Sequence, residues 1–148
     1  SGMLEQAREK IPHGVFKVAQ ANNLPLESCS KDIISIAYGL RNVVEREAAL
    51  KEFYRVLRPN GVLVILEFTT PNKHNIFSKF MQFYTKNILP IVGGLISRNF
   101  KAYRYLPDSI DSFVTRESLE AELLACGMPI LFSKSYSANV SSLLIAQK

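Results

Sequence analysis

The chain has 148 residues, of which 47% are hydrophobic and 21% charged, and its formal net charge is +5; this composition is typical of one folded globular domain. The apolar and glycine stretch from Leu89 to Ile96 is too short to cross a bilayer, and the N-terminus lacks a secretory-signal pattern. Cys29 and Cys126 belong to no CxxC or Cys/His cluster, which argues against a zinc site or a disulfide framework and favours a reducing compartment.

The first elements in chain order are predicted from charge pattern and apolar runs. Alternating charges from Met3 to Ile11 indicate a short helix, and Val15 to Ala19 reads as a short strand. Asp32 to Tyr38 is almost continuously apolar, which is typical of a strand buried on both faces of a parallel sheet.

A helix and a second apolar strand follow. From Glu45 to Leu57 apolar residues recur at helical spacing, with charged residues between them. Pro59-Asn60-Gly61 is a turn signal, and Val62 to Phe68 is apolar until Glu67. Together with the preceding strand, these elements predict a βαβ unit.

The second half predicts further helices and a closing pair of strands. Asn75 to Ile96 is expected to be helical, with interruptions. Thr115 is a good N-cap for a helix that ends at Gly127. The expected apolar face of that helix consists of Leu119, Leu123 and Leu124. Ile130 to Ser133 and Ser142 to Ala146 read as strands, so the whole chain is predicted to be α/β with a mostly parallel sheet.

One window of the chain is purely basic. No Asp or Glu lies between Phe68 and Pro107, and the charged residues there are Lys73, Lys79, Lys86, Arg98, Lys101 and Arg104. Such an aromatic-rich basic window indicates an anionic surface, either lipid headgroups or nucleic acid. The alternative is a solvated helix face that lacks acids.

Ligands of such sheets bind beyond the carboxyl ends of the strands, which draws attention to the residues just after Ala19, Ile36 and Leu66. The sequence has no glycine-rich phosphate-binding turn after a strand, no P-loop, no GxSxG and no HExxH. His13 and His74 stand alone in predicted loops, and no metal site is expected.

Three stretches resemble a known family. They read YGLRNV from Tyr38 to Val43, ALKEFYRVLRPNGVLVILEF from Ala49 to Phe68, and AYRYLPDSI from Ala102 to Ile110. Together they resemble the demethylmenaquinone and 2-methoxy-6-polyprenylbenzoquinol C-methyltransferases of menaquinone and ubiquinone biosynthesis. The resemblance implies S-adenosylmethionine-dependent C-methylation of a polyprenylated quinol ring.

The resemblance also implies an incomplete domain. Residues 1–148 correspond to a class I methyltransferase (Rossmann-like) domain from the helix after the second strand onward. The first two strands, with the glycine-rich turn that is the family's main cofactor motif, are then missing. The expectation is a fragment that is inactive alone, or a gap in the sheet that partner chains fill by strand exchange or homo-oligomerisation.

The cofactor contacts implied by the resemblance follow the strands. Gln20 and Ala21 stand where the family holds adenine, through a side-chain acceptor and a backbone N–H; they could also be plain loop residues. Gln accepts a hydrogen bond, but its longer side chain places the oxygen differently from Asn or Asp. Ala37 replaces the common Ser at the end of the next strand and keeps only its backbone contact.

The catalytic candidates are Arg41 and Asn42. A ring carbon becomes nucleophilic when a ring hydroxyl loses its proton, and a permanent cation such as Arg41 can stabilise the phenolate. Asn42 can hydrogen-bond a ring hydroxyl. The alternative is that both residues merely cap the next helix.

The candidate substrate-binding residues are Tyr38, Glu67, Phe80 and Tyr84. Glu67 reads either as a crevice carboxylate or as a surface residue at a strand end, and Tyr38 either as a crevice wall or as an ordinary aromatic. Phe80 and Tyr84 belong to an aromatic stripe that either covers the substrate or packs on the core. A polyprenyl tail resides in the membrane, so the basic aromatic segment 73–104 is expected to contact the membrane surface.

Other functions are weighed beside this one. The chain could be a non-catalytic truncated paralogue that acts as an interaction module, or part of a methyltransferase for another lipid or small molecule. Nucleic-acid binding is not expected, because no recognisable motif accompanies the basic window. The expected location is cytoplasmic and peripheral to the inner face of a bacterial membrane, or the matrix side in a mitochondrion.

Overall fold

The structure, a computed structural model, describes residues 2–70, 109–110, 112–136 and 140–148. Its elements are helix α1 (Gly2–Lys10), strand β1 (Lys31–Ala37), 3-10 turn η1 (Leu40–Asn42), helix α2 (Arg46–Val56), strand β2 (Leu57–Phe68), helix α6 (Arg116–Ala125), strand β3 (Ile130–Tyr136) and strand β4 (Ser141–Gln147). The helix predicted at 75–96, the basic segment 73–104, Phe80 and Tyr84 lie outside the described residues.

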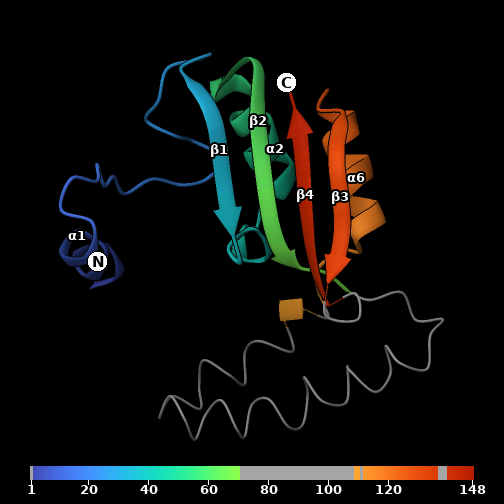
Figure 1. Cartoon of the computed structure of the whole chain (residues 1–148), viewed down its shortest axis with the longest axis horizontal. Coiled ribbons are helices and arrows are strands. Elements are labelled where there is room, and N and C mark those ends of the chain that lie inside the picture. Colours follow the sequence, from blue (N-terminus) through green and yellow to red (C-terminus); the bar gives the residue numbers. More distant parts are fainter. Residues whose placement is uncertain (1, 71–108, 111, 137–139) are drawn as a thin grey trace, which may run out of the picture.

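The strands form one mixed sheet in the order β1-β2-β4-β3. β1 pairs with β2 in parallel, whereas β4 is antiparallel to both β2 and β3. Three strands therefore run in one direction and β4 in the other, with α2 and α6 behind the sheet in Figure 1. The predicted α/β class, the βαβ unit and the closing strand pair are confirmed.

The core lies between the sheet and these two helices. α2 buries Ala49, Leu50, Phe53 and Val56, which share one face of a helix. Of these, Ala49, Leu50 and Phe53 belong to one core cluster with Leu63 and Ile65 of β2, Leu119 and Leu123 of α6, and Leu144 of β4. Each fully buried leucine stabilises the fold by roughly 1.5–3 kcal/mol, so this packing sets the position of the loops at the strand ends.

Local signals define the ends of α6 as predicted. Thr115 is the N-cap, and its hydroxyl accepts a hydrogen bond from the Ser118 N–H at 3.2 Å. Gly127 has a φ of 81°, the left-handed conformation that glycine adopts most readily after a helix. The predicted apolar face is wrong at one position. Leu124 is 55% exposed, because it lies about 100° around the helix from Leu123.

Two strand predictions need correction. Residues 15–19 form no strand, and the Val15 side chain is 86% exposed; no strand among the described residues lies beside them to pair with. β1 is not buried on both faces, since Ile33 is 67% exposed. The physical reason is that β1 is an edge strand of the described sheet and that α2 and α6 both lie behind that sheet.

Candidate functional site

An ion pair joins the carboxyl ends of β1 and β2. Arg41 lies in η1, just after β1, and Glu67 is the second-last residue of β2. The Arg41 Nη1 atom is 2.6 Å from Glu67 Oε1, and the two side chains are 10% and 0% exposed. The pair therefore occupies the edge of the sheet at which a parallel α/β protein is expected to bind its ligand.

Glu67 receives enough hydrogen bonds to remain buried. Its Oε2 accepts the Arg41 backbone N–H at 3.1 Å, and its Oε1 accepts the Phe68 N–H at 2.8 Å. A buried carboxylate is tolerated when it is both paired and hydrogen-bonded. The alternative that Glu67 is a surface strand-end residue is wrong, because its side chain is fully buried.

The Arg41 guanidinium also connects three separate stretches of the chain. Its Nη1 donates to the Tyr38 carbonyl at 2.6 Å, and its Nε donates to the Ser109 hydroxyl at 3.3 Å. It lies 5.4 Å from the centre of the Phe68 ring, which is 4.6 Å from the Tyr38 ring. The stretches 38–43, 49–68 and 102–110 that carried the sequence resemblance thus meet at this cation.

A pocket of about 400 Å³ opens beside this junction. Its described lining residues are Gln20, Ala21, Asn22, Asn42, Val43, Val44 and Glu45. A turn in which the Asn23 N–H donates to the Gln20 carbonyl at 3.1 Å shapes one wall, and the Asn22 amide donates to the Glu45 carboxylate. Amide groups and two valines together suit a flat, polar-edged heteroaromatic ring.

The structure brings some of the predicted site residues together and separates others. Gln20, Ala21 and Asn42 share this pocket, whereas Ala37 and Arg41 are not among its described lining residues. Asn42 does not cap α2, because the N-cap is Glu45. Tyr38 has a φ of 54°, and its side chain is partly exposed beside Phe68.

Sequence reasoning missed Ser109 as a site residue. It is buried and accepts a hydrogen bond from Arg41, although the two residues are 68 positions apart. The one available signal was its place in the stretch AYRYLPDSI, because spacing cannot reveal so distant a contact.

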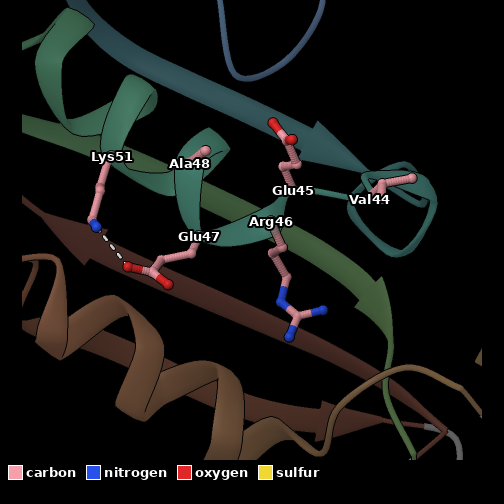
Figure 2. Close-up of a pocket in the computed structure, with 6 residues that line it drawn as sticks. All are labelled: Val44, Glu45, Arg46, Glu47, Ala48 and Lys51. Atoms are coloured by element: carbon pink, nitrogen blue, oxygen red, sulfur yellow. Dashed lines mark hydrogen bonds and ion pairs between the residues drawn. The ribbon is translucent and has the colours of Figure 1, made fainter.

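A second pocket, of about 630 Å³, lies along the start of α2 (Figure 2). The Lys51 ammonium pairs there with Glu47, which lowers the pKa of that carboxyl. Arg46 forms two hydrogen bonds to Glu122 of α6, of 2.6 and 2.7 Å, and these raise its pKa. Because these charged side chains pair with one another, this pocket is a weaker candidate for a catalytic site.

Comparison with known proteins gives one family. The model of the ubiE/COQ5 methyltransferase family matches residues 1–148. A ubiquinone/menaquinone biosynthesis C-methyltransferase UbiE of Campylobacter jejuni is 54% identical over 148 residues, which are 100% of this chain and 63% of the relative. A demethylmenaquinone methyltransferase of Thermus thermophilus is 44% identical over 117 residues, 79% of this chain and 53% of the relative. The chain thus spans less than two thirds of these relatives.

Solved structures agree on the fold. A SAM-dependent methyltransferase from Thermotoga maritima superposes with a TM-score of 0.65 at 22% identity, covering 100% of this chain and 70% of that one. The predicted class I methyltransferase fold is confirmed. None of the helices that the structure describes is long and apolar enough to span a membrane.

Proposed function

The chain belongs to the ubiE/COQ5 methyltransferase family, and we propose that its protein transfers a methyl group from S-adenosylmethionine to a ring carbon of a polyprenylated quinol. The names of the relatives, which refer to menaquinone and ubiquinone biosynthesis, support this substrate class. The observation that carries the proposal is the arrangement of side chains at the carboxyl ends of β1 and β2. Arg41 is fixed there by Glu67, and the adjacent Asn42 lines a pocket with Gln20 and Ala21.

This pocket fits the adenine part of the cofactor. The Gln20 side chain can accept a hydrogen bond from the adenine amino group, and the Ala21 backbone N–H can donate to a ring nitrogen. Val43 and Val44 supply apolar surface for the ring faces. When bound, S-adenosylmethionine supplies an electrophilic methyl group on its sulfonium.

The chain's own residues would prepare the quinol ring. An arginine guanidinium is in general a permanent cation, so it suits the stabilisation of an oxyanion better than the acceptance of a proton. Glu67, Ser109 and the Tyr38 carbonyl hold the guanidinium in one orientation, which removes the cost of ordering it during the reaction. A ring hydroxyl beside this cation would release its proton to water, while Asn42 hydrogen-bonds the ring.

The chain is proposed to be one part of a methyltransferase domain. It covers 63% of the Campylobacter relative, and the outer edge of β1 is unpaired among the described residues. The glycine-rich turn that the family uses for the methionine part of the cofactor is absent from this sequence. The isolated 148 residues are therefore expected to bind the cofactor weakly and to be inactive, unless a second copy fills the sheet by strand exchange.

Peripheral membrane contact is part of the proposal. Its support is the sequence of segment 73–104, which carries six basic residues and no acid, and the substrate's tail, which partitions into lipid. The location would be the cytoplasmic face of a bacterial membrane or the matrix side in a mitochondrion. The candidate substrate contacts Phe80 and Tyr84 lie in the same segment, and Tyr38 would meet the ring near Phe68.

The full-length protein tests this function directly. We expect it to transfer a labelled methyl group from S-adenosylmethionine to demethylmenaquinol in lipid vesicles. Methylation of another lipid or small molecule, with demethylmenaquinol inert, would reassign the substrate. Failure to bind S-adenosylmethionine at all would contradict the enzyme proposal and favour a non-catalytic interaction module.

A further inference from the structure

We propose that Glu52 is a positioning residue that holds the cofactor loop, residues 20–28, in its binding shape without touching the cofactor. The proposal rests on the assignment of the pocket around Gln20 and Ala21 to adenine. Glu52 lies in α2, opposite the loop, and is not among the pocket's described lining residues.

The Glu52 carboxylate binds the loop and a neighbouring cation at once. Its Oε1 accepts the Leu24 backbone N–H at 2.8 Å and the Arg55 Nη2 at 2.7 Å. Its Oε2 accepts the Arg55 Nε at 2.8 Å. This two-point contact fixes the plane of the guanidinium.

Arg55 forms hydrogen bonds to residues further along the loop. Its Nη2 donates to the Leu26 carbonyl at 2.9 Å, and its Nη1 donates to the Ser28 hydroxyl at 3.0 Å. The main chain of α2 continues the contact, because the Arg55 carbonyl accepts the Cys29 N–H at 2.9 Å. Residues 24–29 are thus tied to the last turns of one helix.

The tied residues directly follow the pocket wall. Gln20 to Asn23 form a turn, and Leu24, the next residue, packs against the core while Glu52 holds its N–H. A loop that is already ordered loses less conformational entropy when a ligand binds. Loosening the anchor at Leu24 should therefore weaken the pocket, although no ligand contact is removed.

The anchor stays charged over the pH range of enzyme assays. The Arg55 guanidinium is the main cause that lowers the pKa of Glu52 to about 2, and the Leu24 N–H lowers it further. Cofactor affinity should therefore not change through protonation of Glu52 above about pH 4.

The test compares Glu52→Gln with Glu122→Gln in the full-length protein. Glu122→Gln removes the same charge from a similar two-point pair with Arg46, at the contact between α2 and α6 and away from the loop. Isothermal titration with S-adenosylmethionine and steady-state kinetics are measured for both, and thermal melting confirms that each is folded. Glu52→Gln is expected to raise the Kd and KM for the cofactor about tenfold and to keep kcat at saturating cofactor.

Glu122→Gln should keep the wild-type Kd and KM. Equal cofactor affinity in Glu52→Gln and wild type would overturn the positioning role while the proposed function stands. Equal weakening in both variants would also overturn it, because the effect would then be general destabilisation. If the wild-type protein binds no S-adenosylmethionine, the proposed function fails and this inference fails with it.

Discussion

Two Arg–Glu pairs have the same shortest contact distance, and their arginines stand five residues apart along the chain. Arg41 meets Glu67 at 2.6 Å, and Arg46 meets Glu122 at 2.6 Å. The first pair is buried at the carboxyl ends of β1 and β2, and its Arg41 also contacts the Tyr38 carbonyl, the Phe68 ring and the Ser109 hydroxyl. The second is half-buried and joins two helices. The contact distance alone therefore does not identify a functional pair, whereas burial and the neighbouring residues distinguish the two.

Removal of the buried carboxylate should give the largest loss of stability. Glu67→Ala leaves the Arg41 guanidinium without its main acceptor in a site that water reaches poorly, which is expected to cost about 3 kcal/mol of unfolding free energy. Urea denaturation of the full-length protein measures this cost. A loss below about 1 kcal/mol would mean that the pair is no more consequential than a surface ion pair.

The same truncation in the second pair should cost less. Glu122→Ala leaves Arg46 with partial access to water, so the expected loss is about 1 kcal/mol. The same denaturation experiment applies. If the two losses are equal, burial does not distinguish the pairs and the comparison fails.

Acid should weaken the third pair, Glu52–Arg55, in a defined pH window. In the folded protein the pKa of Glu52 is about 2, below the ordinary value of 4.5. The stabilisation by the pair is therefore fully present above pH 4.5 and is lost as the pH falls towards 2. The expected loss is about 1 kcal/mol, since water screens the partly exposed Arg55. Glu52→Gln should flatten this part of a stability-against-pH curve; an unchanged slope would show that other carboxyls cause it.

Of the four ion pairs, an exposed one is expected to contribute least to stability. Glu47 and Lys51 are both mostly exposed, four residues apart on α2. Glu47→Gln should leave the melting temperature nearly unchanged, because such pairs are screened by water and salt. A clear drop would indicate that Glu47 has a second role at the start of the helix.

The sequence predicted helices and strands better than it predicted which distant segments contact one another. α2, α6 and the closing strands follow from apolar periodicity and caps that are local in the chain. Residues 15–19 have the composition of a strand, but a strand also needs a neighbour, and none of the described strands pairs with them. The pattern within one stretch of sequence does not show whether a neighbouring strand is present.

The candidate site shows the same limit. Arg41 and Glu67 were each recognisable at a strand end, yet their separation of 26 positions in the sequence hides their pairing. In the sequence Glu52 and Arg55 are only two of the charged residues between the apolar positions of α2, whereas the fold places a loop across them. Contacts between distant segments depend on how the core orients the elements, which no single stretch of sequence encodes.

We propose that Arg41, held by Glu67, stabilises charge on the quinol ring. The most direct test is the kcat of methyl transfer in two matched double variants of the full-length protein, Arg41→Met/Glu67→Gln and Arg46→Met/Glu122→Gln, because each removes one pair without leaving an unpaired charge. The expected loss of kcat is about 100-fold or more for the first, and the expected change is within about threefold for the second. A first variant that stays folded and methylates at the wild-type rate would contradict this proposal.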